Sequence, residues 1–392
     1  MRSKGKEILE GKLKVCVRCI YDETVPNIKF DEHGICNYCK SSDSLIEQYK
    51  TGTAEAKQNL DEIIKNIKEE GKNKKYDCVI GVSGGTDSSY LLHLAVKEYR
   101  LRPLAVHYDN TWNTAVATEN IRKVLSKLNV DLFTYVVNNR EADDYVRSFI
   151  IAGVPEIDAP TDIAAPEVLY RACAKYNIRY VLEGHSFIAE GVSPMGNNYF
   201  DGKYIEDIHN KYGKVKSKTF PNMTFYRFIK WTLFKQIKKI RPLWYIKYSK
   251  EMARKLLENE YDWKYYGGHH LENRITEFLH SYYNPRKFDI DNRNWSLAAA
   301  ARNGIMTREE ALQKYAVPLE VSEEFLDYVC KRIEMSRSEL EEYINKPNKS
   351  FRDFKTYKKR FEILRPLFKI MAEKNLVPMS FYLKYCFPLP EA

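Results

Sequence analysis

The sequence predicts an α/β fold built on a doubly wound parallel sheet, with a cysteine-bearing region before it and a mainly helical region after it. Between Tyr76 and about Gly213, short apolar strands alternate with helical segments. That succession is typical of βαβ units, in which helices cover both faces of a parallel sheet. Beyond Lys214 no strand is convincing and helical patterns dominate. We therefore expect three regions, 1–50, 51–213 and 214–392.

Each element is expected from its own pattern. A helix is predicted over 55–70, because Leu60, Ile63, Ile64 and Ile67 recur at helical spacing. Capping boxes at Thr307 with Glu310 and at Ser336 with Glu339 predict two helix starts in the third region. The expected strands are 77–82, 103–110, 131–137 and 178–184, and the helices between them are 88–99, 118–128 and 165–177.

Composition excludes several classes of protein. A chain of 392 residues with 44% hydrophobic and 13% aromatic residues is not disordered. It has no apolar run of about 18 residues and no apolar stretch at the N-terminus, so neither a membrane span nor a secretory signal is expected. Eight cysteines are too few for a disulfide scaffold. A cytoplasmic protein is the prediction.

The positive charge is concentrated in one segment. The net charge is +10, yet residues 211–255 hold fourteen Lys or Arg and one acid, Glu251, so this basic segment carries +13 and the rest −3. Within it, 225–241 places apolar and basic residues on opposite arcs of a helical wheel. Such a helix either packs on the core with a solvated face or docks on a membrane surface or anionic partner. RNA binding is the weakest interpretation.

Two cysteine pairs indicate a metal site. Cys16-x2-Cys19 and Cys36-x2-Cys39 are separated by sixteen residues. Four thiolates suit the tetrahedral coordination of Zn²⁺, and four protein ligands leave no open position, so the site would be structural. An iron–sulfur cluster has the same ligand count and is the alternative.

A phosphate-binding loop is predicted at Val82–Ser89, between a strand and a helix. Gly84 and Gly85 let the backbone approach an anion, and the helix N-terminus points free N–H groups at it. Hydroxyl donors come from Ser83, Ser88 and Ser89. The loop is neither the Walker lysine loop nor the GxGxxG fingerprint.

This strand–SGGTDSS–helix unit resembles the PP-loop ATP pyrophosphatases, which bind ATP, transfer AMP to a substrate oxygen and release pyrophosphate. The resemblance implies an adenine nucleotide alpha hydrolase-like sheet over 51–213. The residues implied for the nucleotide are Ser83, Gly84, Gly85, Asp87, Ser88 and Ser89 for pyrophosphate, His107 for adenine, and Gly184 and His185 for closing the site. Asp87 is also the implied ligand of Mg²⁺.

A narrower resemblance covers about residues 16–312. The motifs CVRC, NYC, VSGGTDSSYLL, VHYDNTWN, PTD, EGHSFIAEG and YYGGHHLENRITEFLH are similar to the N-acetyl sugar amidotransferases of bacterial surface-polysaccharide pathways, such as O-antigen lipopolysaccharide and pseudaminic acid synthesis. The resemblance implies that ATP adenylates an acetamido oxygen and that ammonia displaces AMP, giving an acetamidino sugar. It also implies ammonia from a separate glutaminase with a channel-forming subunit, so 214–392 would be a substrate or partner domain.

Candidate catalytic residues have competing structural interpretations. Asp109 either binds Mg²⁺ or the sugar, or caps the next turn. Thr161 and Asp162, expected just before a helix that carries Glu167, either contact substrate or cap that helix. Glu190 either faces ammonia or the sugar, or is exposed to solvent.

A second group of candidates follows the basic segment. His269, His270, Glu272 and Arg274 are close enough in sequence to line a site, with Arg274 binding a phosphate or carboxylate of the sugar. Lys287 and Arg293 would either neutralise pyrophosphate or be ordinary surface charges. We expect the nucleotide site not to depend on the basic segment.

The main alternative function is a PP-loop tRNA thiolase, since some thiolases also carry a cysteine knuckle before the loop. Those enzymes usually need further cysteines, and Cys173 is the one mid-domain candidate. A nucleotide sensor without catalysis is the other alternative, and the intact SGGTDSS disfavours it. No nucleic acid partner is expected, and the basic segment is a candidate for contact with the glutaminase or with the inner face of the membrane.

Overall fold

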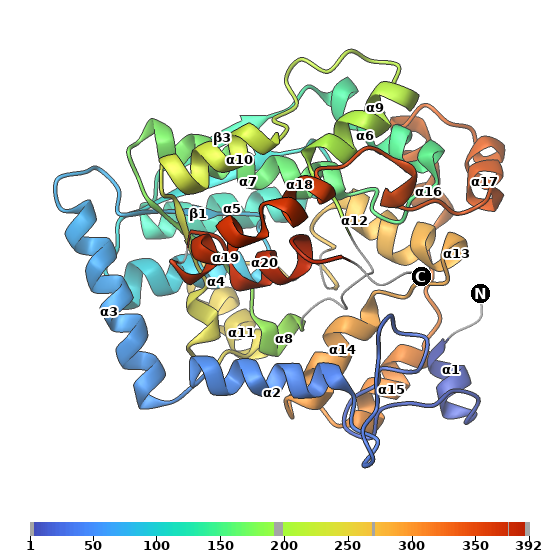
Figure 1. Cartoon of the computed structure of the whole chain (residues 1–392), viewed down its shortest axis with the longest axis horizontal. Helices are drawn as coiled ribbons and strands as arrows, with labels where there is room; N and C mark the ends of the chain where they lie inside the picture. The colour runs from blue at the N-terminus through green and yellow to red at the C-terminus, as the bar shows by residue number, and fades with distance from the viewer. Residues whose placement is uncertain (1–3, 192–198, 269–270, 375, 389–392) are drawn as a thin grey trace.

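Figure 1 shows the computed structural model of the chain, which describes residues 4–191, 199–268, 271–374 and 376–388. One sheet has the strand order β3-β2-β1-β4-β5, and all its neighbours run parallel. The order steps outward from β1 and then crosses to its other side, which confirms the predicted doubly wound fold and places a switch point between β1 and β4. The strands are β1 (Cys78–Gly81), β2 (Pro103–Asp109), β3 (Leu132–Val136), β4 (Tyr180–Leu182) and β5 (Lys238–Ile240).

Helices cover both faces of the sheet. Ile80 and Leu182 point into a core shared with one set of helices, whereas Val79 and Val181 point into a core shared with α7 (Ala159–Lys175) on the other face. The expected helices are present. Those on the first face are α3 (Ala54–Gly71), α4 (Thr86–His93) with its π-helical continuation η1 (Leu94–Glu98), α5 (Ala115–Leu128) and α11 (Lys250–Tyr261).

The prediction that no strand follows Lys214 is wrong. β5 pairs with β4, with Tyr180 opposite Lys238 and Leu182 opposite Ile240. The helix expected over 225–241 ends early, because α10 (Phe225–Ile229) runs into the π-helix η2 (Lys230–Phe234) and Gln236 then adopts a φ of 51°, which no right-handed helix contains. The sheet therefore extends beyond residue 213.

The cysteine-bearing N-terminal region packs against two helices from late in the chain. A core joins Cys16, Ile20 and Tyr21 to Ala298 and Tyr315. In Figure 1 the N-terminal segment, in blue, lies beside α14 and α15, in orange. The elements involved are α1 (Lys4–Leu9), α2 (Asn37–Tyr49), α14 (Arg293–Arg302) and α15 (Arg308–Ala316).

The remaining described elements are all helices, and those after β5 agree with the prediction of a mainly helical C-terminal region. One core forms around α6 (Asn139–Ala152), α9 (Gly202–Tyr212) and α12 (Arg274–Phe278), and another joins α10 to the last helices. Both predicted capping boxes are present, at Thr307 and Ser336. The remaining elements are α8 (Phe187–Glu190), η3 (Pro242–Trp244), η4 (Leu279–Tyr283), α13 (Asn284–Lys287), α16 (Glu323–Arg332), α17 (Arg337–Asn345), η5 (Phe351–Asp353), α18 (Lys358–Ile363), α19 (Arg365–Glu373) and α20 (Met379–Tyr385).

None of the helices in the described ranges has the length and apolar character needed to cross a bilayer.

Candidate functional site

The predicted phosphate loop leaves β1 and enters α4 at the switch point of the sheet. Gly84 has a φ of 81°, and a Cβ there would lie 2.2 Å from the carbonyl oxygen of Ala117, so the turn requires glycine. The side chains of Asn120 and Trp263 both donate to the Gly84 carbonyl, at 3.3 and 3.1 Å. Gly85 is the N-cap of α4, where backbone N–H groups face an incoming anion.

Two side chains from a later segment lie over this loop. The Ser83 hydroxyl donates to Oε1 of Glu272 at 3.3 Å, and the Thr86 N–H donates to the Tyr266 hydroxyl at 3.4 Å. A Cβ on Gly85 would come within 2.9 Å of the same Glu272 oxygen. The chain thus places a carboxylate and a phenol against the cradle in which a phosphate would bind.

Asp87 is held from both sides by the basic segment. The Tyr248 hydroxyl donates to Oδ1 of Asp87, and the Lys250 ammonium is 2.9 Å from Oδ2. The same ammonium is 3.1 Å from Oε1 of Glu190. Burial, with repulsion from Glu190, raises the pKa of Asp87 to about 6, although Lys250 opposes the rise. These two predicted residues, Asp87 and Glu190, are therefore brought together by one lysine.

The turn after β4, which holds Gly184 and His185, lies against the loop. A Cβ on Gly184 would lie 3.0 Å from the Asp87 backbone, a tight contact that favours glycine here. The Trp244 indole donates to Nδ1 of His185 at 3.2 Å, and Nε2 of His185 is 4.0 Å from Glu190. Burial lowers the pKa of His185, which favours the neutral ring.

The end of β2 supplies a hydrogen-bonded chain of polar groups. Nδ1 of His107 donates to the carbonyl of Val82 at 2.8 Å, which leaves Nε2 to accept from the Asn113 amide at 3.2 Å. The same amide lies 3.2 Å from Asp109, and the Thr111 N–H also donates to that carboxylate. Asp109 therefore lies at the carboxyl edge of the sheet, and its carboxylate stabilises the turn that follows β2.

Thr161 and Asp162 lie inside the first turn of α7, one turn earlier than the expected helix start. The Asn110 amide donates to the Thr161 hydroxyl, so this turn is joined to the end of β2, and Asp162 is exposed. Glu167 is fully buried, and its carboxylate accepts from Arg227 and from the Trp231 indole. Glu167 thus anchors the basic segment to the core and does not face substrate.

The second group of candidates separates in space. Glu272 reaches the loop, but the Arg274 guanidinium contacts Glu277 at 2.8 Å and the ring of Phe325. His269 and His270 lie outside the described residues. The Lys287 ammonium donates to three carbonyl groups at the end of α17, and Arg293 pairs with Asp291. The structure therefore does not bring Arg274, Lys287 or Arg293 to the phosphate loop.

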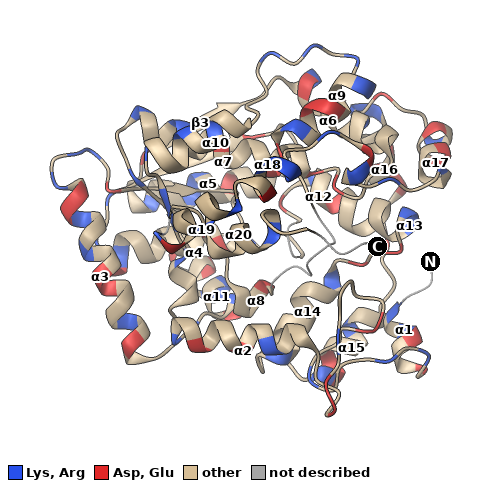
Figure 2. Ribbon diagram, viewed as in Figure 1, with Lys and Arg blue, Asp and Glu red and all other residues tan. Residues whose placement is uncertain are grey.

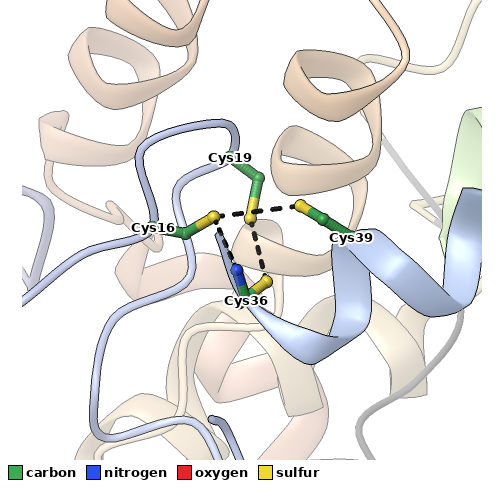
Figure 3. A group of neighbouring side chains, drawn as sticks. All are labelled: Cys16, Cys19, Cys36 and Cys39. Carbon is green, nitrogen blue, oxygen red and sulfur yellow. Dashed lines mark hydrogen bonds between the residues drawn. The ribbon is translucent and has the colours of Figure 1, made fainter. Parts of the chain in front are cut away.

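The four paired cysteines meet, as their spacing predicted (Figure 3). Their sulfur atoms all lie within 4.8 Å of one another, with 3.9 Å from Cys16 to Cys39 and 3.8 Å from Cys19 to Cys36. Thiolates on one tetrahedral Zn²⁺, with bonds of about 2.3 Å, stand about 3.8 Å apart. All four are buried, and a guanidinium nitrogen of Arg302 is 3.8 Å from Cys19. The site therefore fits one metal ion.

Sequence reasoning missed the contribution of the basic segment to the site. Tyr248 and Lys250 hold Asp87, and Arg241, which follows β5, is 3.0 Å from Glu183 next to Gly184. The expectation that the nucleotide site does not depend on residues 211–255 is therefore wrong. The partners of Lys250 lie 60 residues or more away in sequence, so no local pattern indicates them.

A parallel sheet with an SGGTDS loop at its switch point defines the class of the PP-loop ATP pyrophosphatases. Residues 272–367 match the family model described as "LPS biosynthesis protein WbpG-like, C-terminal domain". This match agrees with the resemblance that the motifs of the chain carry. The matched domain and the loop together support a PP-loop enzyme that uses ATP in lipopolysaccharide biosynthesis.

Other similar proteins have more distant relationships. An uncharacterized protein of Methanocaldococcus jannaschii is 26% identical over 321 residues, which cover 80% of this chain and 97% of that protein. Similar solved structures include an NMN synthetase from Francisella tularensis (15% identity, 72% of this chain, 95% of that one, TM-score 0.32) and an NH3-dependent NAD synthetase from Campylobacter jejuni (15%, 74%, 98%, 0.30). A third is the U34-tRNA thiolase NcsA from Methanococcus maripaludis, with its [4Fe-4S] cluster (12%, 78%, 90%, 0.29). At these TM-scores the assignment of the fold rests on the strand order alone.

Proposed function

We propose that the protein is an ATP-dependent, AMP-forming amidotransferase that converts an acetamido group of a lipopolysaccharide sugar into an acetamidino group. The observation that carries the proposal is the contact between Glu272 and Ser83. Glu272 is the first residue matched to the WbpG-like domain, and Ser83 belongs to the phosphate loop. The domain that supports a role in lipopolysaccharide biosynthesis therefore borders the site that would bind the nucleotide.

The reaction needs ATP because a neutral amide is a poor electrophile. The acetamido oxygen would attack the α-phosphorus of ATP, and pyrophosphate would leave. Ammonia would then add to the imidate carbon, the C–O bond would break, and AMP would leave with the former amide oxygen. Loop N–H groups and the hydroxyls of Ser83 and Ser88 would hold the pyrophosphate and balance its charge.

Asp87 and Glu190 fit the implied Mg²⁺, because carboxylate oxygens are the ligands that this ion prefers. Their carboxylates already share one cation, the ammonium of Lys250. When bound, Mg²⁺ would neutralise phosphate charge. For the cysteine site we propose structural Zn²⁺, since the four sulfurs are spaced for a single ion.

Ammonia is proposed to come from a separate glutaminase, which would dock near the carboxyl edge of the sheet.

The basic segment is a weaker candidate for a membrane or anionic partner than its charge suggests. Six of its cations pair with carboxylates of the chain: Lys211, Arg227, Lys239, Arg241, Lys250 and Lys255. Lys and Arg are also spread over the whole ribbon in Figure 2.

The test is to incubate the protein with ATP, ammonium and a set of acetamido sugars. We expect AMP to form together with a mass decrease of about one dalton in one sugar, since NH replaces O. AMP formation that requires tRNA and a sulfur donor would instead establish the thiolase alternative. The burial of all eight cysteines, including Cys173 inside α7, disfavours that alternative because persulfide chemistry needs an accessible thiol.

A further inference from the structure

Lys250 lies between two carboxylates at the carboxyl edge of the sheet. Its ammonium is 2.9 Å from Asp87 and 3.1 Å from Glu190, and its side chain is 23% exposed, against 16% and 11% for the two acids. Three charged groups thus meet where little water reaches them. Removing three charged side chains from water is costly, so uncharged side chains at these positions would stabilise the fold at least as well.

The backbone position of Lys250 also opposes local stability. The Ser249 hydroxyl caps α11 by accepting from the Met252 N–H, so Lys250 is the first residue of this helix. A helix N-terminus carries partial positive charge and disfavours a cation in its first turn. The contacts with Asp87 and Glu190 offset this cost, and they direct the ammonium toward the phosphate loop.

The neighbouring residues keep this ammonium beside the loop. Tyr248 donates to the other oxygen of Asp87, so the carboxylate is held at both ends by the same short segment. Asp87 is the second residue of α4, and the adjacent Ser88 hydroxyl is 3.5 Å from that of Ser83 in the loop. Because lysine has a flexible four-carbon stem, rotation about it can carry the ammonium from a carboxylate to an anion on the loop.

We propose that Lys250 is a phosphate ligand of this site, held beside the loop by Asp87 and Glu190 until a nucleotide binds. The proposal rests on the proposed function only in taking nucleotide phosphates as the loop's ligand. During adenylation the bond between the α-phosphorus and the bridging oxygen breaks, and negative charge grows on the departing pyrophosphate. An ammonium at this position stabilises that charge.

Binding of inorganic pyrophosphate to the full chain, measured by titration calorimetry without added Mg²⁺, tests the proposal directly. Lys250→Met is expected to weaken binding about tenfold or more, because one charge-assisted hydrogen bond is lost. Lys250→Arg keeps the charge and is expected to bind within about threefold of the wild type. The matched control is Lys247→Met, which removes the same charge from an exposed position in the same segment and is expected to leave binding unchanged.

Equal affinity of Lys250→Met and the wild type would overturn the proposal, and so would equal losses in Lys250→Met and Lys247→Met. If circular dichroism shows that Lys250→Met does not fold, labelling of the wild type by an amine-reactive reagent decides the question. Pyrophosphate is then expected to slow labelling of Lys250 at least about threefold without protecting Lys247, and an unchanged rate at Lys250 would refute the assignment.

The two proposals can fail separately. Pyrophosphate binding needs no sugar and no ammonia, so a protein that amidinates no sugar can still show the Lys250 effect. Conversely, a protein that amidinates a sugar but binds pyrophosphate equally well without Lys250 would refute only this inference.

Discussion

Glu272 presents a carboxylate to the same loop hydroxyl that a phosphate would contact. Its Oε1 accepts from Ser83, and its side chain is buried. A carboxylate and a pyrophosphate repel each other at this distance. Glu272 therefore competes with a metal-free phosphate for the cradle, unless a cation comes between them.

We predict that Glu272→Gln binds inorganic pyrophosphate more tightly than the wild type in the absence of Mg²⁺. Removing one negative charge is expected to strengthen binding by about fivefold, equivalent to ~1 kcal/mol. Glu277→Gln is the matched control, because Glu277, the fourth residue of α12, carries the same charge and pairs with Arg274. Weaker binding by Glu272→Gln would mean that the carboxylate attracts the ligand through a bound cation.

At the level of residues, the sequence predicted what depends on local pattern. The glycines and serines of the loop, Asp87 and the four cysteines lie where motif and spacing placed them. Lys250 and Tyr266 could not be predicted, because their roles arise from contacts across more than a hundred residues, with Asp87 and Thr86 respectively. Arg274 shows the converse error, since closeness in sequence to Glu272 did not bring its side chain to the same site.

The strands of the sheet differ in composition, and this difference explains which of them the sequence predicts. The four expected strands are apolar and were recognised, whereas β5 is Lys-Lys-Ile and reads as a charged surface. One of its two lysines, Lys239, is paired with an acid: its ammonium is 2.6 Å from Glu183, and Arg241 contacts the same carboxylate. The strand β5 therefore forms through a tertiary contact, because Glu183, which follows β4, pairs with Lys239 and Arg241.

This cluster predicts a dependence of stability on pH. Burial alone would raise the pKa of Glu183, but Lys239 and Arg241 lower it from 4.5 to about 2. The unfolded chain therefore takes up this proton at higher pH than the folded chain does. The resulting stabilisation is fully present above about pH 4.5 and is lost as the pH falls toward about 2.

Glu183→Gln is expected to lower the free energy of unfolding near neutral pH by about 3 kcal/mol, because two partly buried cations lose their partner. Its free energy of unfolding should also fall less steeply than that of the wild type between about pH 4.5 and 2. Urea unfolding at a series of pH values measures both effects. Glu251→Gln, which removes an exposed acid paired with Lys255, is the control and should change little. Parallel curves for Glu183→Gln and the wild type would contradict the assignment.

In the whole molecule, the first and last thirds of the chain depend on each other. The cysteine region and α14 and α15 share one core, and Arg308 donates to the carbonyls of Cys16 and Cys19. Arg18 in turn donates to the carbonyl of Arg302 at the end of α14. A metal that orders the cysteine turns would therefore also order helices almost three hundred residues away. From the sequence, the cysteine region and these two helices are assigned to separate regions, because a local pattern carries no information about contacts between residues so far apart in the chain.

Loss of the metal should consequently loosen the C-terminal region as well as the N-terminal one. For a structural site the free energy of metal binding is part of the free energy of folding, so Cys39→Ser is expected to lose the proposed zinc and to lower the melting temperature. Limited proteolysis should then cut within 293–316 as readily as within 16–39, because both segments lose the same packing. The control is Cys386→Ser, which alters a buried cysteine in a different core and should retain one zinc per chain by elemental analysis. Cleavage confined to residues 16–39 would show that α14 and α15 stay folded without the metal. Iron in the purified protein, together with visible absorption, would show that the site holds an iron–sulfur cluster and not zinc.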